Sequence, residues 1–262
     1  MSLSRRNLLQ VTAASGALLA GCADGRPAGA APSPASASGG PAAASSAPAS
    51  PAAPSGLPPL PPGLPAQIEH GPRDRPQIAL TFHGQGAPAQ ATALLSEVER
   101  AGARITVLAV GIWLDAYPQL ARRILDGGHE LGNHTQNHAN IDSMNAAAAA
   151  AEIEQCAARL VKLTGSPGRW FRPSRARLTT PLVVGLARRA GYPHLLSYDV
   201  DPRDYADPGA ARVRAAVAAR ATAGSVVSLH FGHPGTVAAL PGILDDLHRR
   251  GLRAVTTSEL LT

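Results

Sequence analysis

Short apolar runs alternate with longer amphipathic segments along the last three quarters of the chain. An apolar run of about four to eight residues bounded by turn residues is typical of a buried strand. The longer segments open at proline, serine or threonine and close near glycine, which is typical of helices. The predicted strands span 77–82, 104–110, 129–133, 170–171, 195–198, 226–230 and 252–255. The predicted helices span 88–102, 118–125, 143–165, 181–190, 208–222 and 241–250, with Ser143 and Thr180 as N-caps of the third and fourth.

Strands that alternate with helices predict a parallel sheet connected by right-handed crossovers. At least six such repeats fit within residues 77–261. This number favours a closed or nearly closed barrel, so the expected fold class is α/β with a distorted (β/α) barrel. In such barrels the functional side chains lie at the carboxyl ends of the strands. Polar residues that directly follow a predicted strand are therefore the candidates for chemistry.

The segment before the domain has a composition that cannot fold alone. Residues 27–65 contain no charged side chain and consist only of Pro, Ala, Ser, Gly and Leu. Such a segment buries too little apolar surface to offset its conformational entropy. We expect residues 23–66 to be a disordered tether of polyproline II character, which could reach roughly 120 Å at about 3.1 Å per residue. The folded domain is then predicted to span residues 67–262.

The first 22 residues resemble a bacterial export signal that ends in a lipid attachment site. Arg5 and Arg6 precede a weakly apolar run, 11–20, as in twin-arginine signals. That run is too short to span a bilayer as a permanent helix. Residues 19–22 (LAGC) resemble a lipobox, which implies cleavage before Cys22 and lipidation of its thiol. We expect an exported lipoprotein on the outer face of the cell membrane; an ordinary signal peptide with a chance cysteine is the alternative.

Charge and cysteine content narrow the classes of function. The formal net charge is +6, but the charges are interspersed and no basic run alternates with aromatic residues. This pattern argues against a nucleic-acid partner. If Cys22 carries a lipid, Cys156 is the only other cysteine, which excludes a disulfide scaffold. Within an alanine-rich helical pattern, Cys156 is expected to be a small buried apolar residue. We expect a monomer.

A histidine pair follows the third predicted strand. Residues 132–138 (GNHTQNH) place His134 and His138 four positions apart, with Thr135 between them. A neutral imidazole is the commonest protein ligand for zinc and similar metals. The spacing can put both ring nitrogens on one side of a turn, and the threonine hydroxyl can fix the loop. The pair therefore indicates a metal site, although surface or core histidines remain the alternative for the pair alone.

Three other predicted strands also end in polar side chains. Arg172 follows the fourth strand and can hold an anionic group by charge-assisted hydrogen bonds, or it is simply solvated. Asp199, Asp201 and Asp204 follow the fifth strand and could orient a histidine or arginine, or form a solvated acidic loop. His230 ends the sixth strand, and an imidazole that titrates near neutrality suits a general acid.

Together these motifs, over residues 77–261, resemble the polysaccharide deacetylase family, also called NodB-homology or carbohydrate esterase family 4 proteins. Residues 134–138 (HTQNH) match the family's His-(Ser/Thr)-x-x-His motif in full. Residues 172–176 (RPSRA) match the start of its third motif but lack the usual Pro-aromatic-Gly. Residues 201–205 (DPRDY) resemble the fourth motif with tyrosine in place of tryptophan, and 229–230 (LH) resemble the fifth.

The resemblance implies hydrolysis of an N-acetyl group on an amino sugar within a distorted barrel. In family members a divalent metal, commonly zinc, is held by the two motif histidines and an aspartate. The metal polarises the acetyl carbonyl and the attacking water. A second aspartate acts as base, and the histidine of the last motif protonates the leaving amine. The implied substrate is a cell-wall or extracellular polysaccharide, such as peptidoglycan.

The first motif departs from the family pattern. The family carries Thr-Phe-Asp-Asp-Gly, whereas this chain has residues 81–85 (TFHGQ). His83 stands at the position of the base, and Gly84 stands at the position of the metal-ligating aspartate. Either His83 serves as base or third metal ligand, or the domain binds glycan without turnover, or the target is another acyl bond such as an O-acetyl ester. Three histidines plus water form an established catalytic zinc set.

These considerations assign a role to each candidate residue. Because Arg172 would face His83, we expect the His83 imidazole to be neutral. The assigned roles are metal ligation by His134 and His138, ligation or base catalysis by His83, acid catalysis by His230, orientation of that acid by Asp201, and organisation of the site by Arg172.

Overall fold

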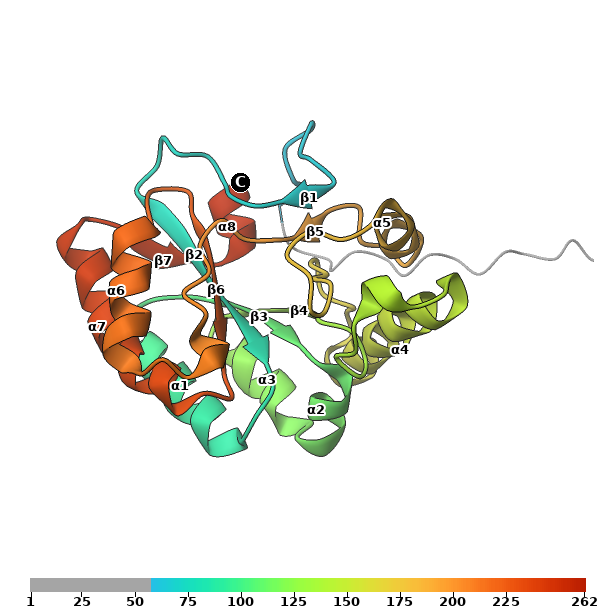
Figure 1. Ribbon diagram of the computed structural model, residues 1–262, viewed down its shortest axis with the longest axis horizontal. Coiled ribbons are helices and arrows are strands. Elements are labelled where there is room, and N and C mark those ends of the chain that lie inside the picture. The colour runs from blue at the N-terminus through green and yellow to red at the C-terminus, as the bar shows by residue number, and fades with distance from the viewer. Residues whose placement is uncertain (1–57) are drawn as a thin grey trace, which may run out of the picture. The chain divides into compact units, whose positions relative to one another are not determined.

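The computed structural model describes residues 58–262 (Figure 1). The export signal, the lipid anchor at Cys22 and most of the predicted tether lie outside the described residues. The strands are β1 (Gln67–Ile68), β2 (Gln77–Gly84), β3 (Thr106–Ala109), β4 (Glu130–Asn133), β5 (Leu195–Leu196), β6 (Val226–His230) and β7 (Arg253–Val255). The helices are α1 (Pro88–Arg100), α2 (Gly111–Ala116), α3 (Gln119–Asp126), α4 (Ala146–Thr164), α5 (Pro181–Arg189), α6 (Ala210–Arg220), α7 (Pro234–Arg249) and α8 (Thr257–Leu261), with short 3-10 turns at Ile141–Ser143 and Asp204–Ala206.

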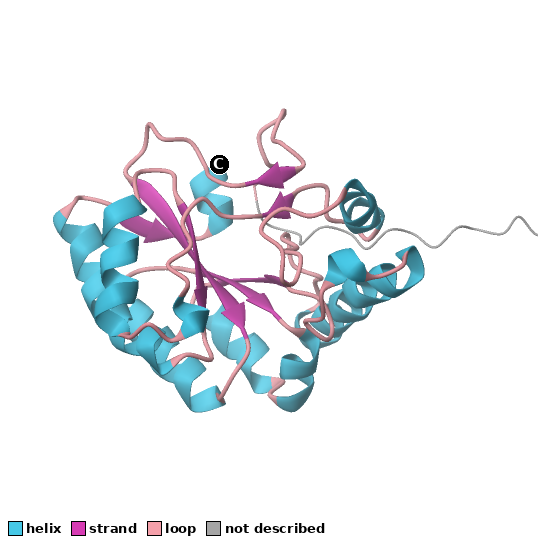
Figure 2. Cartoon of the chain, viewed as in Figure 1, coloured by secondary structure: helices cyan, strands magenta, loops and turns pink. Residues whose placement is uncertain are grey.

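Strand β2 lies at the centre of a parallel sheet with the order β4-β3-β2-β6, and β7 also pairs with β2. Strand β1 pairs in parallel with β5. Single parallel bridges join Phe171 to Asn133 and Leu195, and Val200 to Val227. These bridges link β4 to β5 and the chain after β5 to β6, so the strands form a distorted barrel with helices outside it (Figure 2). The expected α/β fold with parallel strands is confirmed.

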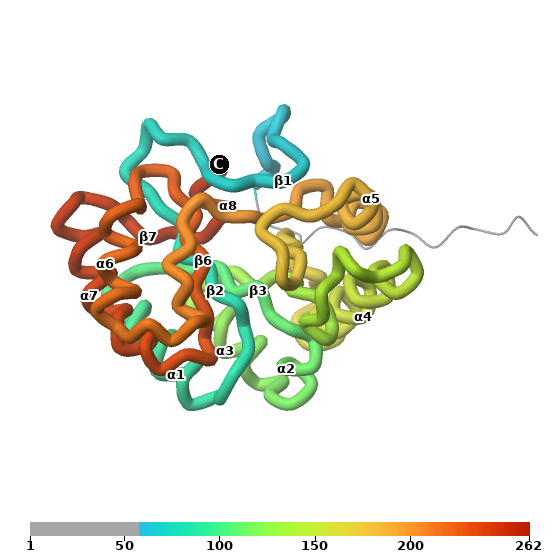
Figure 3. The backbone as a smooth tube through the Cα atoms, viewed as in Figure 1, coloured from blue at the N-terminus to red at the C-terminus, as the bar shows by residue number. Residues whose placement is uncertain are grey.

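Alternate side chains of β2 face two different layers of the core. Leu80 and Phe82 join a large apolar cluster that includes residues of the outer helices α1 and α7. Figure 3 shows the backbone of these two helices outside the sheet. Ala79 instead joins an inner cluster that contains Trp170. Because side chains alternate along a strand, the site at the carboxyl end of β2 receives the side chain of His83, while Gly84 faces the helices.

Two helix starts differ from the sequence prediction. Helix α7 begins at Pro234 and contains Pro241, which was expected to begin it. Buried apolar residues on both sides of Pro241, including Leu240 and Ile243, hold this helix against the core despite the missing proline N–H. Helix α4 is capped by Asn145, whose side chain accepts the Ala148 amide hydrogen. Ser143, the expected cap, belongs to the preceding 3-10 turn.

Several short elements escaped the prediction. Helices α2 and α8 have only six and five residues, too few for a helical period to show. Residues 170–171 form isolated bridges at Phe171 instead of the expected strand. Leu60 and Leu64, within the predicted tether, pack against the inner core cluster. Within residues 58–262, no helix combines the length and apolarity needed to cross a membrane.

Closure of the barrel beside β4 depends on a glycine. A Cβ atom at Gly132 would lie 2.6 Å from the carbonyl oxygen of Trp170. Backbone atoms cannot yield as a flexible side chain does, so we expect Gly132→Ala to lower the free energy of unfolding by about 1–3 kcal/mol. Urea denaturation measures the change. Gly185→Ala in α5 is the matched control, because its Cβ would meet nothing closer than 3.7 Å; alanine should stabilise that helix by up to about 1 kcal/mol. Equal effects at both glycines would contradict the role given to Gly132.

Candidate metal centre and active site

Three imidazoles converge at the carboxyl ends of β2 and β4. One ring nitrogen each of His83, His134 and His138 lies within 4.8 Å of the other two. The ring centroids of His83 and His134 are 4.2 Å apart, and those of His134 and His138 are 4.9 Å apart. Ligands about 2.0–2.1 Å from a tetrahedral zinc ion are separated by about 3.3 Å. The three nitrogens could therefore hold one ion after small side-chain adjustments.

The hydrogen bonds of two of these rings leave a nitrogen free for a metal. His134 Nδ1 lies 2.9 Å from the Arg172 carbonyl oxygen, so Nδ1 carries the hydrogen and donates it. His134 Nε2 is buried and has no hydrogen-bond partner. His83 Nε2 lies 3.2 Å from Ser228 Oγ, whereas its Nδ1 is buried without a partner. Buried polar atoms normally have partners, and metal-bound histidines normally donate their second N–H in this way. The donor set therefore fits a metal ion.

Electrostatics keep the three rings in the form that binds metals. Burial lowers the pKa of His83 well below its ordinary value, and nearby His134, His230 and Arg172 lower it further. Burial, with the neighbouring His138, also lowers the pKa of His134 well below its ordinary value. The pKa of His138 is lowered by burial and then by Arg175. Neutral imidazole is the ligating form, and the direction of the His83 shift agrees with the expected neutral ring.

A strained loop presents His134 and His138. Thr135 and His138 both adopt left-handed backbone conformations, with φ of 68° and 56°. The Asn133 side chain accepts the Thr135 amide hydrogen at 2.9 Å, and Thr135 Oγ1 accepts the His138 amide hydrogen at 3.2 Å. Glu152 of α4 accepts hydrogen bonds from the backbone and side-chain N–H groups of Asn137. These bonds fix a conformation that residues other than glycine rarely adopt.

His230 is held by a carboxylate other than the expected one. Its Nδ1 lies 2.8 Å from Asp204 Oδ1, and its backbone N–H donates to Asp204 Oδ2 at 2.8 Å. Asp204 is 1% exposed and also accepts a hydrogen bond from Thr236 Oγ1. Asp201, assigned this role from the sequence, instead accepts the amide hydrogen of Arg203 in its own loop. The turn Asp204–Ala206 carries Asp204 inward, which is the physical reason for the correction.

Arg172 lies fully buried beneath the histidines. Its Nε donates to the Leu196 carbonyl oxygen at 2.9 Å, and one terminal nitrogen donates to Thr81 Oγ1 and the Ser197 carbonyl oxygen. The other terminal nitrogen has no partner. None of the ion pairs between described residues includes Arg172, and burial lowers its pKa to about 9. The arginine thus ties neighbouring strand ends together while its charge stays uncompensated by a carboxylate.

Gly84 cannot substitute for the ligating aspartate of the family pattern. A Cβ atom there would lie 3.0–3.2 Å from Val107, Ala109 and Trp113, all in the helix-covered layer. A side chain at this position would therefore be crowded against the helix-covered layer. The ligand set of this chain has to come from the inward-facing position, which is His83.

The candidate residues border a hollow of about 350 Å³ at the strand ends. Its walls include His83, His138, His230, Tyr198, Tyr205 and Arg175. A somewhat larger cavity of about 410 Å³ lies near the starts of β3 and β4 and includes Glu130 and Arg169. None of the candidate catalytic or metal residues borders this second cavity. The chemistry therefore belongs to the smaller hollow, where a substrate group can reach the histidines.

Comparison with known proteins agrees with this geometry. The family model for polysaccharide deacetylases matches residues 70–195. A peptidoglycan-N-acetylglucosamine deacetylase from Bacillus cereus is 34% identical over 194 residues, covering 72% of this chain and 90% of that protein. The chain belongs to the polysaccharide deacetylase family. A chitooligosaccharide deacetylase from Bradyrhizobium is 31% identical over 162 residues, covering 56% of this chain and 73% of that protein.

Solved structures show the same fold as this family member. A carbohydrate esterase family 4 pseudoenzyme from Bacillus anthracis matches with a TM-score of 0.71 at 22% identity, covering 76% of this chain and 70% of that one. A peptidoglycan N-acetylglucosamine deacetylase matches with a TM-score of 0.70 at 24% identity, covering 75% and 92%. The resemblance inferred from the sequence motifs is confirmed at the level of family and fold.

The sequence reasoning missed three residues that support the site. Asp204 is one of three loop aspartates that could orient a histidine or arginine, and nothing in the sequence distinguishes it from Asp201 as the partner of His230. Asn133 directly precedes His134, and its position at a strand end could have indicated a loop-capping role. Glu152 is a buried acid within an alanine-rich helix, and its spacing from the histidine loop gives no signal in the sequence.

The lowered histidine pKa values predict a pH-dependent stability of the metal-free protein. The unfolded chain takes up protons near pH 6.5, whereas folded His83 and His134 resist protonation. The unfolded state therefore binds more protons below that pH. The stability contributed by the neutral rings is present above about pH 6.5 and is lost as the pH falls. Each ring contributes at most about 1.4 kcal/mol per pH unit.

Urea denaturation of the chelator-treated protein between pH 8 and 5 measures this dependence. In the His83→Gln variant, the free energy of unfolding should fall less steeply as the pH decreases. Its slope should be smaller by up to about 1.4 kcal/mol per pH unit, which corresponds to one proton. His248→Gln is the matched control, because His248 is exposed on α7, and it should retain the wild-type slope. An unchanged slope in the His83 variant would contradict the assignment of a neutral buried His83.

Proposed function

We propose that this protein is a metal-dependent hydrolase that removes acetyl groups from N-acetylated amino sugars of a cell-wall or extracellular polysaccharide. One observation carries the proposal: three buried or half-buried imidazole nitrogens converge beside a hollow at the strand ends. Family membership and the deacetylases among its relatives support the same reaction.

The proposed ligand set is His83, His134 and His138. A three-histidine set is typical of catalytic zinc, so zinc is the proposed metal. When bound, the metal polarises the acetyl carbonyl and the attacking water. The convergence of the three nitrogens favours His83 as the third ligand over His83 as the base. This assignment leaves no side chain of the first motif to accept a proton.

His230 is proposed to move the proton. Its Nδ1–H is committed to Asp204, which leaves Nε2 as the basic atom of a ring that borders the hollow. Nε2 accepts a proton from the attacking water as the new C–O bond forms. The same proton then passes to the amide nitrogen as the C–N bond breaks, which releases acetate and an amine. One imidazole thus serves as base and as acid.

Arg172 is proposed to organise the site through contacts on both sides of the strand ends. Its carbonyl oxygen fixes the tautomer of His134, and its guanidinium holds Thr81, Leu196 and Ser197 in place.

The proposed setting is the cell envelope, with peptidoglycan or a related glycan as partner. The expected export signal would direct the chain there, and the expected lipid on Cys22 would then hold the domain at the outer face of the membrane by a tether.

The missing first-motif carboxylates favour a second candidate, a glycan-binding lipoprotein without turnover. Neither His83 nor Gly84 supplies the aspartate pair typical of the family. The two functions differ in acetate release. A purified protein that contains metal, binds oligosaccharide and releases no acetate from peptidoglycan or chitooligosaccharide would support the binding function and contradict hydrolysis.

Metal content tests the ligand set. We expect the purified protein to bind about one equivalent of zinc, and His134→Ala or His83→Ala to lower zinc affinity at least about 10–100-fold, the range seen even for outer-shell changes. Elemental analysis and competition with a chromogenic chelator give the readout. If His83→Ala retains zinc at full affinity, His83 is not a ligand, and a role as base is favoured instead. The exposed His248→Ala serves as control.

A matched pair of substitutions tests the orientation of His230. Asp204→Asn should lower kcat for acetate release about 10²–10⁴-fold, the usual value of general acid–base catalysis, while zinc content stays unchanged. Asp201→Asn should stay near the wild-type rate, because its side chain caps its own loop. Acetate release from chitooligosaccharide is measured with both variants. A large loss with Asp201→Asn and none with Asp204→Asn would return the role to Asp201.

A further inference from the structure

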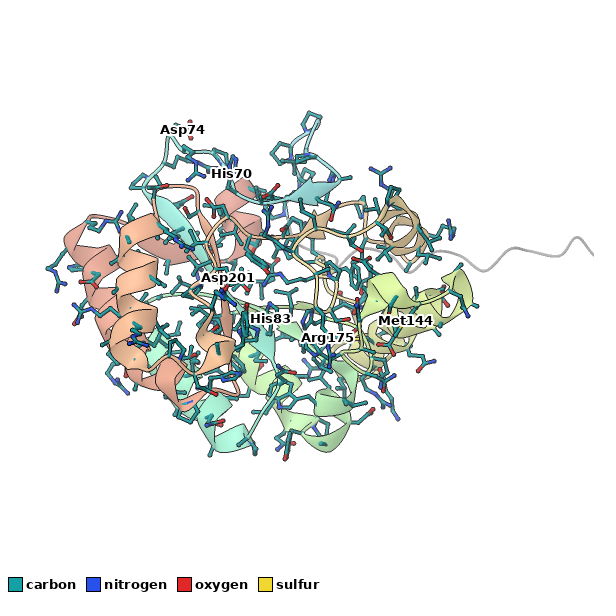
Figure 4. All side chains as sticks on the ribbon, in the orientation of Figure 1. His70, Asp74, His83, Met144, Arg175 and Asp201 are labelled. Atoms are coloured by element: carbon teal, nitrogen blue, oxygen red, sulfur yellow. The ribbon has the colours of Figure 1, made fainter. Side chains whose placement is uncertain are left out.

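The charged side chains in the walls of the histidine hollow are all positive. Its walls include Arg175 and Arg177 but no aspartate or glutamate. Figure 4 labels Arg175 and His83, which both border this hollow. Asp204 lies behind His230 and is occupied by the ring, the backbone N–H and Thr236. Beneath the hollow, the Arg172 charge has no carboxylate partner among the described residues. A ligand in this hollow therefore meets positive charge that the walls do not neutralise.

The two wall arginines differ in what they already bind. Arg177 forms an ion pair with Glu69, so its charge is largely compensated. Arg175 is exposed and takes part in none of the ion pairs between described residues. Its Nε donates to the His138 carbonyl oxygen at 3.1 Å, which holds the guanidinium beside the histidine loop. The terminal nitrogens of Arg175 remain free to bind a ligand.

Arg175 also occupies a bridging position. It borders the histidine hollow, and it borders a second hollow of about 390 Å³ that contains Gln85, Trp113 and Asn137. His138 also borders both hollows. A ligand whose reacting group lies against His230 would therefore place its adjoining portion within reach of the Arg175 guanidinium. The planar fork of arginine matches a carboxylate by two parallel hydrogen bonds.

The backbone at Arg175 supports a function for this side chain. Its φ of 59° is in the left-handed region, which is uncommon for a side chain other than glycine, asparagine or aspartate. Ser174 precedes it and donates to the Ala139 carbonyl oxygen, which fixes the turn to the histidine loop. The turn therefore holds the Arg175 backbone against the histidine loop while its side chain stays exposed.

We propose that Arg175 determines the substrate class by binding a carboxylate on the sugar unit next to the one that loses its acetyl group. The protein then prefers an anionic oligosaccharide to a neutral one. This inference rests on the proposed deacetylase function, because that function determines which sugar unit lies against His230. It concerns binding, however, and so it can be tested without turnover.

Isothermal titration calorimetry on the zinc-loaded full-length protein tests the proposal with three probes. The first is a peptide-free peptidoglycan tetrasaccharide, whose alternate sugars carry a free carboxylate. The second is its carboxyl methyl ester, which has nearly the same shape without the charge. The third is neutral chitotetraose. We expect the free acid to bind about tenfold tighter than the ester or chitotetraose at low salt, a preference that weakens as salt rises.

Four variants assign the preference to Arg175. Arg175→Gln should abolish most of the preference, Arg175→Glu should reverse it, and Arg175→Lys should retain part of it. Arg188→Gln is the control of equal charge change, because Arg188 is exposed on α5 and borders neither hollow. Circular dichroism spectra show whether each variant is folded. If Arg175→Gln and Arg175→Glu do not fold, Arg175→Lys still tests the role of this side chain.

The outcomes separate this inference from the proposed function. Equal affinity for acid and ester, no detectable binding of the acid, or a preference that survives in Arg175→Gln would overturn the role of Arg175. Acetate release is assayed in parallel. No release from any probe, together with a tenfold preference lost in Arg175→Gln, would contradict the deacetylase function while supporting recognition of an anionic glycan.

Discussion

Parallel pairing of β2 with β3 and β6 in one register positions every group of the site. His83 pairs directly with His230 across β2 and β6, and their ring centroids lie 4.2 Å apart. On the other side, β3 pairs with β4, whose end leads into His134. Because side chains alternate along a strand, a shift of one residue in β2 would replace His83 by Gly84 and remove the third imidazole. The candidate metal site and the position of His230, for which we propose proton transfer, both depend on this register.

The site combines neutral ligands with an uncompensated cation. Burial lowers the pKa values of His83 and His134, so these rings carry no charge at neutral pH. Among the residues that the structure describes, Arg172 is buried without a carboxylate partner, and the exposed Arg175 forms no ion pair. In the family pattern, two aspartates would supply negative charge at this point. Their replacement by His83 and Gly84 leaves neutral imidazoles beside an arginine charge that no carboxylate of the described residues pairs with.

The replacement is accommodated by the surrounding structure and is not an isolated loss. Gly84 fits because Val107, Ala109 and Trp113 close around it in the helix-covered layer. Asn133 and Glu152 fix the turn that presents the histidine pair. A site that keeps its supporting hydrogen bonds retains the geometry that ligand binding requires. These contacts maintain the arrangement of the histidine pair on which the proposed hydrolysis depends.

The sequence alone determined the family, the parallel α/β fold, and the residues His83, His134, His138, Arg172 and His230 that meet at the strand ends. These follow from local patterns: apolar runs, the position of polar residues after them, and their order. Only the tertiary structure decided that Asp204 and not Asp201 contacts His230, because a single 3-10 turn determines which carboxylate points inward. It also decided the tautomer of His134 and the open charge of Arg175, since hydrogen bonds between residues distant in sequence leave no periodic signal in the chain.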